Sequence, residues 1–165
     1  MMTIAEPLVT RLGPENVQAA QTLFSLISDV FCIEQPHLSD DYVRSLLEHD
    51  EFWALTATVD EKIIGGLTAH ALRQTTAEGK ELFIYDIAVH PDHQRQGHGR
   101  RLIDRLRSAA ATQDIDTLFV AADNDDVHAL DFYQALGGTA SPVTFFEFQA
   151  TAPGLEAARP SRPAP

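Results

Sequence analysis

The first third of the chain carries apolar patterns that predict one strand and two helices. Pro7 to Leu12 is typical of a short strand, and apolar residues then recur at helical spacing from Val17 to Phe31. Pro36 lies in the following segment, which must therefore end the first helix. Ser39 is a typical helix N-cap followed by two acids, so it predicts the start of a second helix.

Three β-rich runs follow. Phe52 to Val59 and Ile63 to Leu72 are separated by Asp60-Glu61-Lys62, which is typical of a hairpin. Gly65-Gly66 lies inside the second run and indicates a bulge or a close backbone approach. The third run is Leu82 to Val89. We therefore expect three consecutive antiparallel strands.

The last third predicts two further helices and two further strands. Thr117 to Ala122 follows an amphipathic helix, and this crossover makes it parallel to Leu82 to Val89. A later helix ends at Gly137-Gly138, and Ser141 to Phe148 is typical of a final strand. Residues 151–165, rich in Pro and Ala, predict a disordered tail. The inward faces of the two helices would carry Leu102, Ile103, Leu106, Ala110, Ala129, Leu130, Tyr133 and Leu136.

The element order is therefore βααβββαβαβ, in a single domain over residues 1–150. The predicted fold is α/β (α+β), with a mixed, mostly antiparallel central sheet flanked by about four helices. The strand expected at Val143 to Phe148 would lie at an edge of this sheet, which offers a surface for a homodimer.

Charge narrows the set of partners more than overall composition does. The net charge of −12 argues against nucleic acid and against anionic membrane surfaces, and it suits a cationic partner. An acidic surface that only keeps the protein soluble is the alternative. The N-terminal residues lack the pattern of a signal peptide, and no apolar stretch is long enough to span a bilayer, so we expect a cytoplasmic protein.

The single cysteine, Cys32, excludes an intramolecular disulfide and a cysteine metal cluster. We expect it to be a small core residue.

A candidate anion site begins where the third β-rich run ends. After Val89 the chain passes Pro91 and a loop that ends Gln94-Arg95-Gln96-Gly97-His98-Gly99, where a helical pattern starts. Backbone N–H groups of a first helical turn lack partners within the helix, and glycines let a phosphate approach them. The run lacks the Lys-Ser/Thr ending of a P-loop and the three-glycine dinucleotide spacing. It therefore predicts a pyrophosphate site, with Arg95, Arg100 and Arg101 as phosphate neighbours.

This loop resembles the acetyl-CoA signature of the GNAT N-acetyltransferases, Gln/Arg-x-x-Gly-x-Gly/Ala, through Gln94, Gly97 and Gly99. The resemblance implies direct transfer of an acetyl group from acetyl-CoA to an amine. It also implies that the two parallel strands splay apart around the pantetheine arm, and that a backbone N–H polarises the thioester. The coenzyme A contacts that it implies are Ile87, Ala88, Val89, Gln94, Arg95, Gln96, Gly97, His98, Gly99, Arg100, Arg101 and Asn124.

Acetyl transfer needs a base for the amine and an acid for the departing thiolate. The resemblance implies that Tyr133 is the acid; a core aromatic is the alternative. Tyr85 and Asp86 are the candidate bases. Strand alternation sends them to opposite faces unless a bulge intervenes, and a water relay from another acid is the remaining option.

A closer similarity is to the GNAT-type aminoglycoside 3-N-acetyltransferases. It rests on the runs IYDIAV, HQRQG, QPHLSDDY, AADNDDVHALDFYQALGG and TFFEF. It implies that Asp123, Asp126 and Glu147 are acids on the substrate side, in agreement with a polycationic substrate. The chain departs from that family at Phe145, where the family has His, and at His128, where it has Pro.

Three further acids, Glu34, Asp40 and Asp41, lie near the bend before the second predicted helix. Asp40 and Asp41 either contact substrate or interact favourably with the helix dipole.

Other activities also stay open: acetylation of a polyamine, another small amine or a protein N-terminus, and a non-catalytic acyl-CoA-binding module.

Overall fold

The structure is a computed structural model that describes residues 7–34 and 36–150. The chain divides into two compact units, Met1–Ala121 and Ala122–Pro165, which we describe separately. Within the described residues no helix is long and apolar enough to cross a membrane. The predicted tail at 151–165 lies outside those residues.

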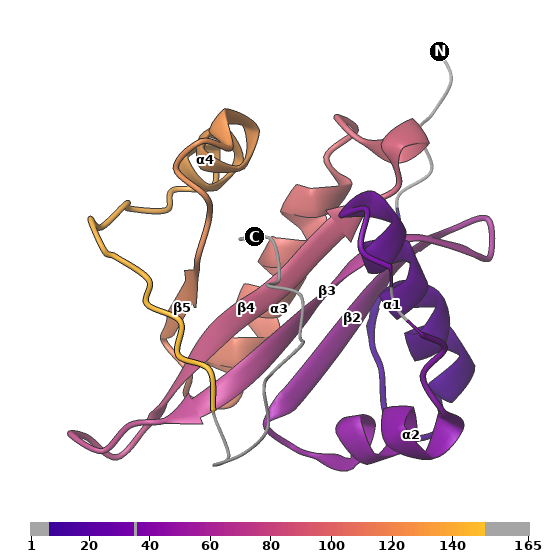
Figure 1. The fold of residues 1–165 in the computed structure, drawn as a ribbon, viewed down its shortest axis with the longest axis horizontal. Helices are drawn as coiled ribbons and strands as arrows, with labels where there is room; N and C mark the ends of the chain where they lie inside the picture. The colour runs from indigo at the N-terminus through magenta and orange to yellow at the C-terminus, as the bar shows by residue number, and fades with distance from the viewer. Residues whose placement is uncertain (1–6, 35, 151–165) are drawn as a thin grey trace. The chain divides into compact units, whose positions relative to one another are not determined.

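The first unit is built on a five-stranded sheet in the order β1-β2-β3-β4-β5 (Figure 1). The first four strands pair antiparallel, and β4 and β5 pair in parallel, as the sequence predicts. The strands are β1 (Leu8–Arg11), β2 (Phe52–Val59), β3 (Lys62–Arg73), β4 (Lys80–Val89) and β5 (Thr117–Val120).

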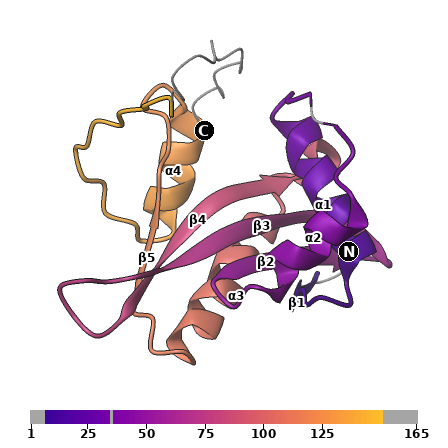
Figure 2. The same ribbon diagram turned by 60° about the horizontal axis from the view of Figure 1, so that its bottom comes forward.

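Helices cover both faces of this sheet (Figure 2). The helices α1 (Val17–Val30) and α2 (Asp40–Glu48) lie on one face, and α3 (His98–Ala111) lies on the other. The α1 face has a core in which Leu23 and Val43 pack with Ala54 and Ala88 of the strands. The predicted inward residues of α3 are all buried, namely Leu102, Ile103, Leu106 and Ala110.

Local signals define the helix ends. The Ser39 side chain accepts a hydrogen bond from the Tyr42 N–H, so Ser39 is the N-cap of α2 as expected. At the end of α1, the N–H groups of Cys32 and Ile33 donate to the carbonyls of Asp29 and Ser28, which is the Schellman pattern. Cys32 therefore adopts a left-handed φ of 54° and is exposed, so the prediction that it is a core residue was wrong.

The glycine pair in β3 explains how α1 approaches the sheet. The register between β2 and β3 shifts opposite Gly65, which confirms the expected bulge. A Cβ on Gly66 would lie 2.3 Å from the Leu55 carbonyl oxygen and 2.5 Å from Leu23 Cδ1 of α1. Both distances are shorter than van der Waals contact, so a residue without Cβ is needed where Leu23 packs on the strand.

The second unit contains α4 (Val127–Ala135). Asp126 caps its start by accepting from the Ala129 N–H, and the N–H groups of Gly137 and Gly138 close its end on the carbonyls of Gln134 and Tyr133. The described residues after α4 form no strand, so the prediction of a final strand at Ser141 to Phe148 was wrong. Phe145, Phe146 and Phe148 are exposed in this segment. Their high β-propensity predicted a strand, but the segment forms no hydrogen-bonded strand pairing. Residues 136–150 therefore contain no strand edge of the kind on which the homodimer was expected, and the homodimer stays a prediction.

Replacing Gly66 with Ala should destabilise the first unit, because the added Cβ forces Leu23 or the β2 backbone to move. We expect a loss of about 1–3 kcal/mol in the free energy of unfolding, measured by urea denaturation. Gly79→Ala is the matched control, because its Cβ would meet only the Gln74 Oε1 atom at 3.5 Å. Equal losses in the two variants would contradict the close approach of α1.

Candidate active site

A β-bulge in β4 determines which side chains reach the face of the sheet on which α1 and α2 lie. Thr68 of β3 pairs with Asp86, and Ala69 pairs with Ile84, so Tyr85 is the additional residue. The Tyr85 ring lies against His70, and the Asp86 carboxylate accepts a hydrogen bond from Thr68 Oγ1 at 3.0 Å. Thr68 and His70 are two apart on one strand and share a face. Tyr85 and Asp86 therefore lie on the same face. The sequence allowed this outcome only if a bulge occurred between them.

A row of rings crosses this face. Phe52, His70, Tyr85, Phe83 and Phe119 are in consecutive ring contact, with centroid separations from 5.1 to 5.8 Å, and they come from four neighbouring strands. Tyr85 is 43% exposed and Phe119 is 41% exposed, so the β4 and β5 end of the row remains accessible. The row therefore places five rings side by side next to the bulge, most of them edge-on or tilted to their neighbours.

The pairing of β4 with β5 ends at the same place. Its last pair joins Ile84 to Val120, and within the described residues β4 continues to Val89 without a β5 partner. The His90 N–H donates to Ile64 of β3, and successive residues of a strand point their N–H groups to opposite sides. The N–H groups of Val89 and Ile87 therefore point away from β3, toward the unpaired side. This agrees with the predicted splay of the two strands.

The loop between β4 and α3 has the geometry of an anion-binding turn. A 3₁₀ turn at Pro91–His93 precedes it, and the Gln94 side-chain amide fastens it by donating to the Val89 carbonyl at 2.9 Å. Gln96 donates in the same way to the carbonyl of Asp92 at 3.2 Å. Gly97 then adopts a left-handed φ of 85° and is the N-cap of α3, with no atom within 4 Å of an added Cβ. The first N–H groups of α3 start directly after this open corner.

His98 is the buried residue of this loop. It is 2% exposed, and its Nδ1 atom has no hydrogen-bond partner among the described residues. Burial lowers the pKa of His98 below its usual range, and the charges of Arg101 and His93 lower it further. Burial therefore favours the neutral form of this imidazole.

The acids before α2 divide into two groups. Asp40 and Asp41 lie in the first turn of α2, where Asp40 Oδ1 accepts from the Gln21 side chain of α1 at 2.8 Å and Asp41 lies 3.4 Å from the Arg44 guanidinium, so both have structural partners. Glu34 is exposed. A groove of about 640 Å³ runs nearby along α1 to His90 and Pro91, and its acid among the described lining residues is Asp29, which the sequence did not single out.

The remaining predicted residues belong to the second unit. Burial and the nearby Asp126 carboxylate raise the pKa of Tyr133 to about 12. Asp126 is the cap of α4, and Asp123 accepts from the Asp125 N–H at 2.9 Å in a turn that includes Asn124. Glu147 is exposed. The roles assigned to these residues stay predictions.

The sequence missed His70, although it contained a signal. His70 interrupts the apolar run of β3 with an ionisable side chain, and only the register with β4 shows that it contacts Tyr85 and lies near Asp86. No group of three or more possible metal ligands occurs in the described ranges.

Residues 20–138 match the model of the acetyltransferase (GNAT) family, and the chain belongs to this family. GNAT acetyltransferases use acetyl-CoA as the acetyl donor. A chloroplastic GCN5-related N-acetyltransferase 2 of Arabidopsis thaliana is 35% identical over 83 residues, which are 50% of this chain and 29% of the relative. The ribosomal protein bS18-alanine N-acetyltransferase of Escherichia coli is 33% identical over 73 residues, 44% of this chain and 48% of that protein. The chain thus spans less than half the length of these two relatives.

Solved structures resemble the chain over more of its length. An aminoglycoside acetyltransferase from an uncultured soil metagenomic sample has a TM-score of 0.83 and 32% identity, over 89% of this chain and 100% of that one. A second soil enzyme of that name, solved in complex with sisomicin, has a TM-score of 0.84 and 28% identity, over 88% and 97% of the two chains. The observed fold is therefore the GNAT fold that the sequence predicted.

The buried His98 should make stability depend on pH. Below its ordinary pKa of about 6.5 the unfolded chain takes up a proton that the buried imidazole resists, so the free energy of unfolding should fall as the pH decreases from 7 to 5. One such group contributes at most about 1.4 kcal/mol per pH unit. His98→Leu should flatten this dependence in urea titrations at several pH values. His49→Leu, at an exposed position, is the control, and an unchanged slope in His98→Leu would refute the assignment.

Proposed function

We propose that the protein transfers the acetyl group of acetyl-CoA to an amine of a polycationic small molecule, and that this molecule is an aminoglycoside acetylated at its 3-amine. The main support is the similarity, over nearly the whole chain, to soil aminoglycoside acetyltransferases, one of them solved with sisomicin. The net charge of −12 agrees with a substrate that carries several ammonium groups. The 3-amine is carried over from the sequence resemblance alone.

The donor would be held by the loop and the free side of β4. The open corner at Gly97 and the first N–H groups of α3 fit a pyrophosphate, and Arg95, Arg100 and Arg101 lie next to it in the chain. The N–H groups of Ile87 and Val89 point to the side where β5 no longer pairs, so they are suited to hydrogen-bond the pantetheine arm and the thioester oxygen. The thioester supplies an activated acetyl group.

Tyr133 would act on the departing thiolate. Because its pKa is raised to about 12, the phenol keeps its proton at neutral pH and can donate a hydrogen bond. A coenzyme A thiolate is a much weaker base than a phenolate of that pKa, since thiols have pKa values of about 8.5. Tyr133 would therefore stabilise the thiolate by hydrogen bonding, with full proton transfer left to solvent.

The candidate substrate-binding acids differ in whether their carboxylates already have hydrogen-bond or ion-pair partners. Asp126 caps α4, Asp123 closes a turn, and Asp40 and Asp41 have side-chain partners. Glu34 and Glu147 are exposed and are the better candidates for ammonium contacts. The departures at Phe145 and His128 would alter which aminoglycosides fit.

A second candidate substrate is a protein N-terminus. The observation that favours it is the similarity to the bS18-alanine N-acetyltransferase of Escherichia coli, although it covers 48% of that protein. A polyamine would suit the same acidic surface, and a non-catalytic acyl-CoA-binding module is the remaining alternative.

The decisive experiment measures thiol release from acetyl-CoA with a panel of aminoglycosides, polyamines and peptides with free N-termini. We expect saturable turnover with at least one aminoglycoside, and an NMR spectrum of the product with the acetyl group on the 3-amine. Turnover of peptides alone would replace the proposal with N-terminal acetylation. Coenzyme A binding without turnover of any amine would support the non-catalytic module.

Gly97→Ala should weaken coenzyme A binding, because a left-handed φ of 85° costs a residue with Cβ about 1–2 kcal/mol and the corner would relax. We expect a loss of roughly tenfold in affinity by calorimetry. Gly137→Ala is a matched control, since Gly137 has a φ of 84° and equally open surroundings at the end of α4. Equal effects of the two variants on affinity would argue against the loop as the pyrophosphate site.

A further inference from the structure

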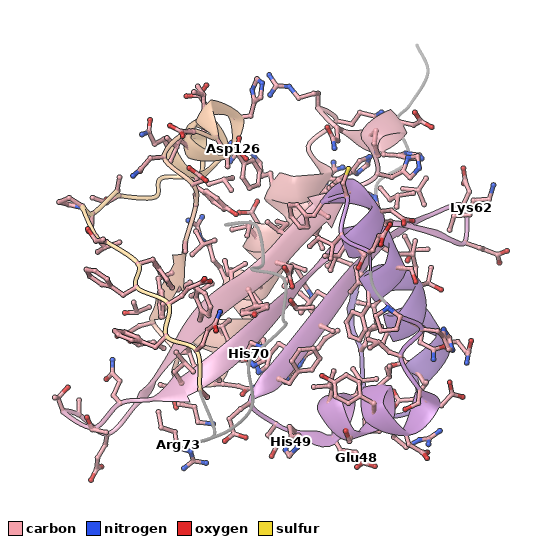
Figure 3. All side chains as sticks on the ribbon, in the orientation of Figure 1. Glu48, His49, Lys62, His70, Arg73 and Asp126 are labelled. Carbon is pink, nitrogen blue, oxygen red and sulfur yellow. The ribbon has the colours of Figure 1, made fainter. Side chains whose placement is uncertain are left out.

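His70 lies beside both residues that the sequence offers as bases. Its ring centroid is 5.5 Å from that of Tyr85, with the planes nearly perpendicular at 79°. Thr68, two residues earlier on the same face of β3, donates to Asp86 and fixes that carboxylate toward this face. Figure 3 shows His70 on the sheet, toward the end of β3 that carries Arg73, and His49 at the end of α2. Three ionisable side chains, His70, Tyr85 and Asp86, therefore lie together at the bulge.

The surroundings of His70 favour its neutral, proton-accepting form while keeping a negative charge nearby. Burial lowers the pKa of His70 below its usual range, and the Asp86 carboxylate partly opposes this effect. The ionisable groups that face the imidazole from β4 are Asp86 and Tyr85, and β2 contributes the ring of Phe52 at 5.3 Å. A neutral imidazole with an adjacent carboxylate has the usual composition of a general base and the residue that stabilises its protonated form.

We propose that His70 is the general base for the amine acceptor and that Asp86 is its positioning residue. This inference rests on the proposed acetyl transfer. It differs from the sequence-based assignment, in which Tyr85 or Asp86 removes the proton. Asp86 already accepts a hydrogen bond from Thr68 and is partly buried, so it is placed to stabilise an imidazolium. Tyr85, 43% exposed and edge-on to the imidazole, forms the wall beside it.

The reaction balances with these groups. The amine nitrogen forms a bond to the thioester carbonyl carbon, and the carbon–sulfur bond breaks with its electron pair on sulfur. The proton lost by the nitrogen passes to the imidazole of His70, directly or through one water, and the Asp86 charge stabilises the resulting imidazolium. The imidazolium returns the proton to solvent, and the products are the amide and coenzyme A.

The test compares the pH dependence of kcat/KM for wild type and His70→Asn, with His49→Asn as the control for loss of an exposed histidine. We expect His70→Asn to lower kcat by roughly 10²–10⁴-fold, to leave the KM for acetyl-CoA unchanged, and to remove the acid limb of the profile. His49→Asn should behave as wild type. An acid limb that persists in His70→Asn with kcat reduced less than about fivefold would overturn the proposal.

Asp86→Asn separates a positioning role from a structural one. Loss of the carboxylate should lower the pKa of His70 further, so its imidazole NMR titration and the acid limb of kcat/KM should both move to lower pH. Movement of the two together supports the pair. A limb that stays in place while the NMR titration moves would assign the proton to another group. His70→Gln, checked for folding by circular dichroism, replaces His70→Asn if the latter does not fold.

The choice of acceptor keeps this test independent of the aminoglycoside proposal. If wild type acetylates only a polyamine or a peptide, the aminoglycoside proposal fails and the same pH profiles are measured with that amine. If no amine reacts, the slow hydrolysis of acetyl-CoA, in which water replaces the amine, is compared between wild type and His70→Asn. Equal hydrolysis rates across the pH range would then overturn the role of His70 as a base.

Discussion

One register shift in β4 determines which polar side chains lie on the face of the sheet that carries His70. Without the additional residue at Tyr85, either Tyr85 or Asp86 would point toward α3, where the strands are lined by Leu82 and Ile84. The bulge instead brings both side chains to the face that carries His70, and the pairing with β5 ends one residue earlier. A single backbone irregularity thus sets the positions of the polar side chains on this face.

The face that carries His70 and the loop before α3 each depend on a few side-chain hydrogen bonds. On the face that carries His70, the partly buried Asp86 carboxylate accepts a hydrogen bond from a hydroxyl of the neighbouring strand. In the loop, two glutamine side chains satisfy backbone carbonyls while the backbone N–H groups at the start of α3 stay available to a ligand. His98 is the exception, since its buried Nδ1 atom has no hydrogen-bond partner among residues 7–34 and 36–150. An unpaired buried polar atom lowers the stability of the structure around it.

Patterns within single segments predicted most of the first unit. Helical spacing and the cap at Ser39 placed α1 and α2, and alternating apolar runs placed β2, β3 and β4. The parallel pairing of β5 followed from the crossover rule.

Features that depend on strand register were harder to predict from the sequence. The sequence signalled the bulge at Gly65-Gly66 through its glycines, whereas the bulge at Tyr85 occurs in an ordinary apolar run and left no local mark. The proximity of His70 to Asp86 depends on that second bulge. The strand expected at Ser141 to Phe148 had strong β-propensity, but propensity does not provide a partner strand.

The end of α1 has a practical consequence for work on this protein. Cys32 is exposed and is the only cysteine of the sequence. It adopts a left-handed backbone conformation, which glycine adopts without steric strain. Each polypeptide therefore presents one protein thiol to the reagents that count free coenzyme A, and this thiol fixes the baseline of such measurements. The same sulfur is a unique attachment point for a fluorophore, at the corner where α1 leaves the sheet. Its backbone geometry would accept glycine if a thiol-free protein were required.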